Sequence, residues 1–202
     1  GNVSFYNGTN KRNIFPTPVI GGVGLINKLF KPIGHNFKKD KSVILLIGKT
    51  FGHLEQSCFL KENYSIVDGM PPEINLLNEK NNGENVLKLI QDNLVLSSHD
   101  VSSGGLLVTL SEMSMSSEFG IKIQKPKKLT NLSQYYFGED QSRYVLEIED
   151  DNFAKIEKML KNNNIYYENI GFTQKDYFEI EGEMKIQIKE LYKINNEWYN
   201  NY

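Results

Sequence analysis

The hydrophobic and polar positions along the chain follow two periods, one typical of strands and one typical of helices. Residues 43–47 form an unbroken apolar run that ends at Gly48, which predicts a strand buried on both faces of a sheet. Residues 143–149 alternate apolar with mostly charged side chains, which predicts a half-exposed strand. Residues 177–181 and 184–189 flank a Glu-Gly-Glu turn and predict a β-hairpin.

Other segments carry apolar residues at helical spacing. A short apolar run at 94–98 precedes two serines and Gly104-Gly105, and apolar residues then recur at helical spacing over 106–113, which predicts a strand, a tight loop and a helix. Residues 150–160 begin with two Asp and predict an amphipathic helix, as does the spacing over 191–202.

The order of these elements predicts an α/β (α+β) fold in which a mixed sheet is flanked by helices. The Asn-rich stretches at residues 81–85 and 162–164 predict surface turns. With 202 residues and 39% apolar content, the chain is long enough to bury a core as one domain, or as one domain and a fragment.

Charge and targeting signals exclude several classes of partner. The net charge is -2, from 23 basic and 25 acidic residues, so the sequence offers no basic face for nucleic acid or an anionic membrane. It holds no apolar run of membrane-spanning length and no signal-peptide pattern, and we therefore expect a cytoplasmic protein. The chain opens at Gly1 without an initiator Met, so it was either processed or is a piece of something longer.

The first candidate site is the N-terminal segment that contains Gly1, Asn2 and Ser4. A Gly lets backbone amides approach a phosphate, an Asn oxygen is a neutral ligand suited to magnesium, and a Ser hydroxyl can bond to a substrate oxygen. A magnesium-nucleotide site also needs carboxylates, and this segment has none. From its residues alone, the segment is interpreted as a plain polar loop rather than a site.

The second candidate is the Pro- and Gly-rich stretch at residues 16–24. A dinucleotide-binding fingerprint needs a third glycine, and Leu25-Ile26-Asn27 follows Gly22-Val23-Gly24 without one. The stretch is therefore interpreted as a strand that joins two domains.

The third candidate is the loop at residues 98–106, between a predicted strand and a predicted helix. Free amides at a helix start form a natural anion site, and Gly104-Gly105 keeps side chains away from it. His99 and Asp100 are either an acid/base pair or a structural hydrogen-bonded pair, and we favour the structural role with the loop near a ligand.

Two further features are open to alternative interpretations. Residues 137–143 contain Glu139, Asp140 and Arg143, which would either bind a cation or a phosphate or form a cluster that is solvated or internally paired. Adjacent acids point apart on an extended chain, which argues against a shared ligand. The single Cys58 is predicted to be a core cysteine rather than a glutaminase nucleophile, because nothing nearby in the sequence would form its thiolate.

Five segments in this order resemble one family. The segments are residues 1–7, 16–21, 70–72, 99–106 and 137–145. Together they resemble the C-terminal part of phosphoribosylformylglycinamidine synthase of the small, subunit II type. The resemblance implies a superfamily of paired N-type and C-type domains shared with aminoimidazole ribonucleotide synthetase, selenophosphate synthetase and thiamine-phosphate kinase.

The resemblance also implies a division of the chain. Residues 1–37 resemble the trailing edge of an N-type, ATP-binding domain with its connecting strand. Residues 38–190 resemble a C-type synthetase domain, and residues 191–202 are expected to form a C-terminal helix.

For the site, the resemblance implies that Gly1 contacts ATP, Asn2 binds Mg²⁺ and Ser4 contacts the substrate, formylglycinamide ribonucleotide. The family's catalytic histidine and acidic metal ligands lie upstream, so no catalytic residue is expected in this chain. The implied reaction is phosphoryl transfer from ATP to the formyl-amide oxygen, followed by displacement of phosphate by ammonia in purine biosynthesis.

The implied partners are a separate glutaminase subunit, which supplies the ammonia, and a small bridging subunit. The chain is expected to be inactive alone. The alternatives are a non-catalytic binding module of the same fold and a sister ATP-dependent enzyme of the superfamily.

The sequence departs from the family pattern at Gly8, where Glu is usual, at Ser103, where Asp is usual, and over residues 52–58. These departures argue against chemistry around Asn7 or His99.

Overall fold

The structure is a computed structural model that describes residues 7–9, 12–14, 19–26, 31–126 and 131–200. The chain divides into two units, Gly1–Lys31 and Pro32–Tyr202. In the first unit, β1 (Asn7–Thr9) pairs antiparallel with β2 (Arg12–Ile14). Residues 19–26 lie in neither helix nor strand, so the connecting strand expected there is not formed in this described stretch. A strand requires a hydrogen-bonded neighbour as well as an extended chain.

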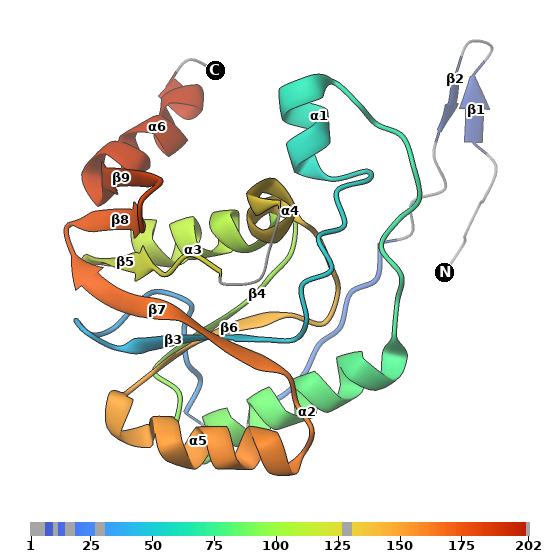
Figure 1. Cartoon of the computed structure of the whole chain (residues 1–202). Helices are drawn as coiled ribbons and strands as arrows, with labels where there is room; N and C mark the ends of the chain where they lie inside the picture. Colours follow the sequence, from blue (N-terminus) through green and yellow to red (C-terminus); the bar gives the residue numbers. More distant parts are fainter. Residues whose placement is uncertain (1–6, 10–11, 15–18, 27–30, 127–130, 201–202) are drawn as a thin grey trace. The chain divides into compact units, whose positions relative to one another are not determined.

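The second unit is built on a seven-stranded sheet in the order β4-β6-β3-β7-β5-β8-β9 (Figure 1). Neighbouring strands are antiparallel except β5 and β8, which run parallel, so the sheet is mixed as predicted. The strands are β3 (Val43–Ile47), β4 (Ser97–Asp100), β5 (Phe119–Ile123), β6 (Tyr144–Ile148), β7 (Tyr167–Lys175), β8 (Tyr177–Ile180) and β9 (Met184–Gln187).

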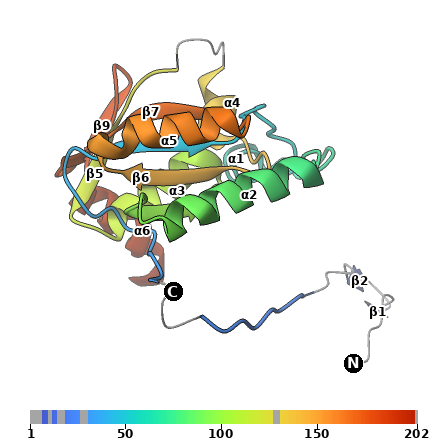
Figure 2. The ribbon, with the colours of Figure 1, turned by 90° about the horizontal axis from the view of Figure 1, so that it is seen from below.

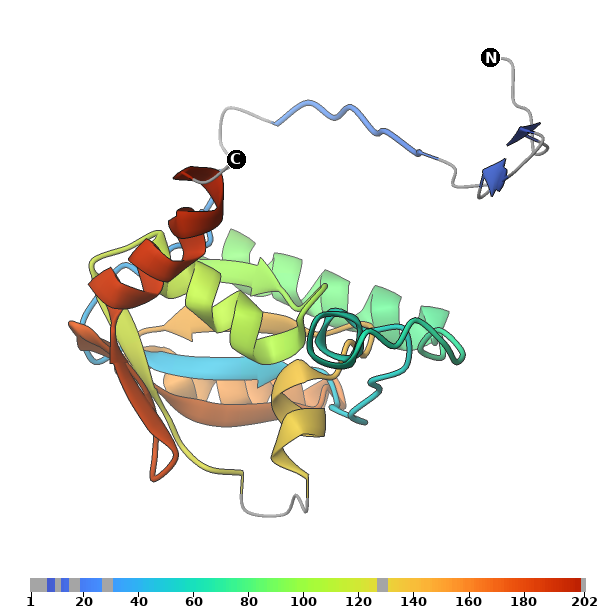
Figure 3. The same ribbon diagram turned by 90° about the horizontal axis from the view of Figure 1, so that it is seen from above.

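Helices cover both faces of this sheet. Figures 1 and 2 show α2 and α5 side by side on one face, and Figure 3 shows α3, α4 and α6 on the other. This arrangement confirms the predicted fold class. The helices are α1 (Cys58–Tyr64), α2 (Leu76–Gln91), α3 (Gly105–Met115), α4 (Leu132–Phe137), α5 (Asp150–Asn162) and α6 (Ile188–Asn200).

The central strand β3 joins the two layers of the core. Ile44 and Leu46 face the cluster that contains α3, while Val43, Leu45 and Ile47 face the cluster that contains α2 and α5. All five are buried, which confirms the predicted strand with two buried faces. Burying each such side chain stabilises the fold by about 1.5–3 kcal/mol.

The prediction of a half-exposed strand at residues 143–149 is wrong. In β6, Val145, Leu146, Glu147 and Ile148 are all buried. Glu147 is 0% exposed because donors from the rest of the chain reach its carboxylate. A charged residue inside an alternating pattern therefore does not always mark the solvent face.

The prediction of a surface turn at residues 81–85 is also wrong, because these residues lie inside α2. The helix starts at the N-cap Asn75, whose side chain accepts a hydrogen bond from the amide of Asn78. Its buried face includes Val86, Leu89 and Asn82, and the Asn82 side chain donates to the carbonyl of a neighbouring loop. The packing of the apolar face outweighs the turn preference of Asn.

The remaining predicted elements are formed. The hairpin is β8 and β9, and the predicted helices correspond to α3, α5 and α6. The strand expected at 94–98 begins only at Ser97, and Leu94 and Val95 before it are buried in the core cluster that contains α2 and α5. Among the described residues, no helix has the length and apolar character needed to cross a bilayer.

Candidate functional site

A polar cavity of about 260 Å³ lies where the loop after β4 meets the loop before β6. It borders the start of α3, so the loop predicted to lie near a ligand does border a cavity. Most of its lining side chains are charged or carry hydroxyl groups. The lining residues are Pro72, Glu79, Asp100, Val101, Ser102, Ser103, Glu139, Gln141, Ser142, Arg143 and Tyr144.

The anion position at the start of α3 is occupied by a side chain of the chain itself. Gly104 caps the helix in a left-handed conformation (φ 84°), as its glycine allows. Its amide donates to Oε1 of Glu139 at 2.8 Å, and the amide of Cys58 donates to the same oxygen at 2.8 Å. The Glu139 carboxylate therefore sits where a phosphate would bind at this helix start.

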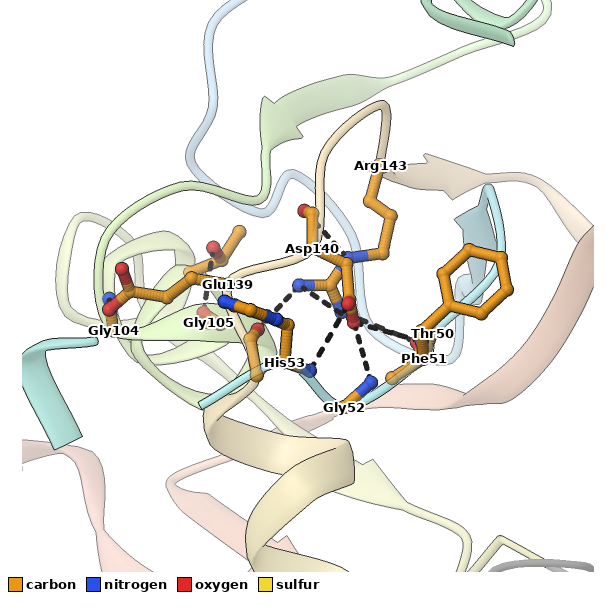
Figure 4. Close-up of polar contacts among 11 residues, drawn as sticks. Thr50, Phe51, Gly52, His53, Gly104, Gly105, Glu139, Asp140 and Arg143 are labelled. Atoms are coloured by element: carbon orange, nitrogen blue, oxygen red, sulfur yellow. Dashed lines mark hydrogen bonds and ion pairs between the residues drawn. The ribbon is translucent and has the colours of Figure 1, made fainter. Parts of the chain in front are cut away.

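Asp140 points the opposite way and holds the loop after β3 (Figure 4). Its carboxylate accepts hydrogen bonds from three consecutive amides, those of Phe51 at 2.9 Å, Gly52 at 2.9 Å and His53 at 3.2 Å. The adjacent acids thus do point apart, as predicted. Asp140 is only 4% exposed, so the cluster is internally paired, which was one of the two interpretations of residues 137–143.

Arg143 is the buried cation of this cluster (Figure 4). It is 1% exposed and donates to the carbonyls of Gly138 at 2.5 Å and Asp140 at 3.2 Å, and to Oγ1 of Thr50 at 3.3 Å. Its Nη2 lies 4.0 Å from Oδ2 of Asp140. Burial lowers the pKa of Arg143, and the nearby Asp140 opposes that change.

Glu79 on α2 is another carboxylate that lines the cavity, and it is held by two hydroxyl groups. Oγ of Ser142 donates to Oε2 at 2.6 Å and the Tyr144 hydroxyl donates to Oε1 at 3.0 Å. Partial burial and the bond to Glu79 raise the pKa of Tyr144 to about 12. The sequence analysis missed this pair, because Glu79 lies outside every motif and is 65 residues from Tyr144 in the chain.

His99 contacts carboxylates through both ring nitrogens. Nδ1 lies 3.3 Å from Asp100 and Nε2 lies 3.3 Å from Glu112 on α3. The His35 ring packs edge-on against it, with the ring centroids 5.3 Å apart. With both nitrogens engaged, the geometry favours a structural pair over an acid/base pair.

The prediction of a core cysteine is wrong, because Cys58 is exposed at the start of α1. The residues before Cys58 cannot share a buried helical face with it, because α1 begins only at Cys58, after the N-cap Ser57. Although the residue is exposed, its thiol is partly desolvated, and this burial and the nearby Glu139 raise the pKa of the Cys58 thiol. A raised pKa disfavours the thiolate, which argues against a nucleophile.

The sequence-predicted site residues Gly1, Asn2 and Ser4 lie outside the described residues. Across the described ranges, no three His, Cys, Asp or Glu side chains gather closely enough to hold a metal ion. Glu79 and Glu139 in the cavity lining, and Asp140 beside it, accept hydrogen bonds from protein donors, so these three carboxylates serve as structural groups.

Two comparisons show what this chain is similar to in sequence. Residues 40–181 match the family described as "AIR synthase related protein, C-terminal domain". Over 202 residues, the chain is 43% identical to the "Phosphoribosylformylglycinamidine synthase subunit PurL" of Pelagibacter ubique (strain HTCC1062) and 38% identical to that of Rhodopseudomonas palustris (strain HaA2). These matches cover 100% of this chain but only 28% and 27% of the two relatives. The chain therefore spans little more than a quarter of their length.

Solved structures share the fold. "T. maritima PurL complexed with FGAR" matches with a TM-score of 0.67 and 14% identity, over 79% of this chain and 29% of that chain. "Structure of PurLQS from Thermotoga maritima" matches with a TM-score of 0.59 and 16% identity, over 79% and 27%. The thiamine-monophosphate kinase of Stenotrophomonas maltophilia K279a matches with a TM-score of 0.53 and 13% identity, over 75% and 53%. At these identities the likeness concerns the fold alone.

Proposed function

Because this chain belongs to the AIR synthase related protein, C-terminal domain family, we propose that it is the C-terminal part of an ATP-dependent carbon-nitrogen ligase, phosphoribosylformylglycinamidine synthase. The resemblance predicted from the five sequence segments is confirmed by the similarity to PurL subunits. The single observation that carries the proposal is 43% identity extending over all 202 residues, including those before the family match at 40–181.

In the proposed reaction, the whole enzyme transfers the γ-phosphoryl group of ATP to the glycinamide carbonyl oxygen of formylglycinamide ribonucleotide, and the formyl group is unchanged. Ammonia then attacks the glycinamide carbonyl carbon, the phosphate leaves with its bridging oxygen, and an amidine remains. Positioning and charge neutralisation do most of the work in phosphoryl transfer. In this chain Gly1 would contact ATP, Asn2 would bind Mg²⁺ and Ser4 would contact the substrate, while the catalytic histidine and acidic ligands would lie upstream.

The proposed domain division is the one implied by the family resemblance. Residues 1–37 would close an N-type domain, residues 38–190 would form the C-type domain and residues 191–202 the terminal helix. A C-type domain whose helix-start anion position is filled by its own Glu139 suits a scaffolding role. The proposed partners are a glutaminase subunit and a small bridging subunit, since a similar solved structure is named PurLQS. We place the complex in the cytoplasm.

The magnesium assignment is tested with Asn2→Ala in the longer protein that carries this chain. Loss of one metal ligand should raise the magnesium concentration required for half-maximal activity by at least about tenfold. Asn13→Ala in β2 is the matched control and should leave the requirement unchanged. An unchanged magnesium requirement in Asn2→Ala would remove Asn2 from the site.

A non-catalytic binding module of the same fold is the second candidate. The observation that favours it is that, in the part of the chain that the structure describes, no side-chain cluster suits a metal. The reading frame upstream of Gly1 discriminates between the two. Several hundred residues with a histidine and carboxylates support the ligase, and a Met immediately before Gly1 supports the module. A sister ATP-dependent enzyme would be recognised by the substrate that the longer protein accepts.

A further inference from the structure

Residues 66–77, which lead from α1 into the first turn of α2, expose a series of large apolar side chains. Single exposed apolar side chains are common on protein surfaces, but a patch of several large ones marks an interaction site. Six of these residues are large and apolar, and each is between 46% and 76% exposed. They are Ile66, Val67, Met70, Ile74, Leu76 and Leu77, here called the α1–α2 surface.

The backbone of this segment is held in place, although residues 66–75 lie outside helices and strands. The Gln56 amide donates to the carbonyl of Asp68 at 3.3 Å, and the Met70 amide donates to Oε2 of Glu55 at 2.6 Å. Nε2 of His53 donates to the Met70 carbonyl at 2.8 Å. Figure 1 shows the segment running along the outside of the second unit from α1 to α2. A fixed backbone therefore presents these apolar side chains to solvent.

The charges near the α1–α2 surface have one sign. Between Lys61 and Lys80 the sequence contains four acidic residues and no basic one. Three of the four, Glu62, Asp68 and Glu73, are exposed. Interfaces combine an apolar centre with a polar border, and the charges of the two partners are complementary. A partner that fits this surface would therefore present apolar side chains bordered by Lys or Arg.

We propose that the α1–α2 surface is the contact between this chain and the remainder of the longer protein to which it belongs. The match to the PurL subunit of Pelagibacter ubique covers 100% of this chain but 28% of that relative, so most of such a protein lies outside this chain. Compact domains of one chain pack against each other through surfaces of this kind. The inference rests on the proposed function, in which this chain is the C-terminal part of a longer ligase.

The α1–α2 surface also adjoins the polar cavity of the candidate site. Pro72 lies between Met70 and Ile74 in the same segment, and it lines the cavity together with Glu79 on α2. A partner seated on the α1–α2 surface would therefore border the cavity as well.

The first test measures whether Met70 is covered in the longer protein. Hydrogen peroxide oxidises exposed methionines, and mass spectrometry of the peptides gives the rate at each one. Met70 is 71% exposed on this chain, whereas Met113 is 0% exposed and serves as the buried reference. In the folded longer protein, Met70 should react at least about tenfold more slowly than in the same protein unfolded in urea.

Two results of this measurement would overturn the proposal. One is a Met70 that reacts as fast in the folded longer protein as in the unfolded one. The other is protection that disappears when the purified protein is diluted, because the occupant would then be a second copy rather than a part of the same molecule.

Leu77→Glu tests whether the α1–α2 surface itself makes the contact. Leu77 is 67% exposed, so a glutamate fits the unit but places a charge inside the proposed interface. Oxidation of Met70 should become about tenfold faster than in the parent protein. The matched control is Ile194→Glu, which makes the same kind of change to a 54% exposed side chain on α6 and should leave Met70 protected.

Slow oxidation of Met113 in both variants shows that the fold is kept. A Leu77→Glu protein in which Met70 stays as protected as in the parent would contradict the proposal. If Leu77→Glu does not fold, the cross-linking experiment decides.

A benzophenone amino acid placed at Leu76 identifies the occupant in the purified longer protein. The expected cross-link joins this position to a peptide of the same molecule that lies outside these 202 residues and carries Lys or Arg near the attached side chain. A cross-link to a second copy, a cross-link within the 202 residues, or no cross-link overturns the proposal.

The ligase assay separates this inference from the proposed function. A longer protein that protects Met70 but has no ATP-dependent ligase activity would refute the proposed function and leave the interface standing. An active longer protein in which Met70 is freely oxidised would refute the interface alone.

Discussion

At the scale of single residues, Asp140 joins the loop before β6 to the loop after β3. It accepts the amides of Phe51, Gly52 and His53 and lies beside the buried Arg143. Asp140→Ala should lower the free energy of unfolding by about 3–5 kcal/mol, because it leaves a buried guanidinium without its counter-charge. Urea denaturation measures the change.

The exposed Asp68→Ala is the control for Asp140→Ala and should shift the free energy of unfolding by less than about 0.5 kcal/mol. An Asp140 variant as stable as the parent would mean that Arg143 and the loop of residues 51–53 are held by other contacts.

The raised pKa of Tyr144 predicts that the free energy of unfolding depends on pH in the alkaline range. Its pKa is raised from 10.0 to about 12 by partial burial and by Glu79, so the folded state favours the protonated phenol. The stability that this preference contributes is fully present below pH 10 and is lost as the pH rises through 12. In Tyr144→Phe, the fall in the free energy of unfolding between these pH values should be shallower. An equally steep fall in parent and variant would show that Tyr144 does not contribute to it.

At the scale of elements, α1 depends on contacts at its first turn. All of α1 is described, and none of its residues is buried. The amide of Cys58 donates to Glu139, and the Phe59 ring stacks on Phe137 with the centroids 4.6 Å apart. In contrast, α3 buries apolar side chains such as Leu106, Leu110 and Met113. The two helices that share Glu139 should therefore differ in their dependence on it.

Glu139→Gln should speed amide exchange in α1 by about tenfold, because a charge-assisted hydrogen bond at the helix start is weakened. Exchange within α3 should stay slow, since its packing remains. Glu62→Gln, which changes an exposed carboxylate 3.5 Å from Lys61, is the control and should leave α1 as it is. Equal protection of α1 in both variants would show that stacking on Phe137 alone holds the helix.

The elements also show how far the sequence predicts the fold. Where apolar residues are dense, as in β3 and α3, both element and burial are predicted correctly. Strand β7 was missed, because its nine residues include polar Thr173 and glycine Gly171 at buried positions, and its place is set by pairing with β3 and β5. Glu147 was assigned to the solvent face because its donors, the amides of Lys38 and Lys39, are more than 100 residues away.

The candidate site was predictable only in its location. The motif around Gly104 correctly indicated a helix start beside a loop. The segment at 137–143, which lies next to it in space, was also identified from its charged residues. That Glu139 fills this position was not predictable, because the contact between the Gly104 amide and Glu139 spans 35 residues. No local pattern reports which carboxylate reaches which amide across such a separation.

At the scale of the whole molecule, the chain combines an N-terminal unit with a larger unit in which carboxylates bind backbone amides. In the described part of the larger unit, the carboxylates at Glu139, Asp140 and Glu147 all bind backbone amides. They hold in place the loops and the segment before β3 that contains Lys38 and Lys39, as expected of structural groups. The proposed contacts with ATP, magnesium and substrate fall instead at Gly1, Asn2 and Ser4.

The measurement that tests this account most directly is product formation from ATP, Mg²⁺, ammonia and formylglycinamide ribonucleotide. We predict that the longer protein carrying this chain forms the amidine product and releases phosphate in equal amounts, and that the 202-residue chain alone forms none. Turnover by the 202-residue chain alone, or no turnover by the longer protein, would contradict the account.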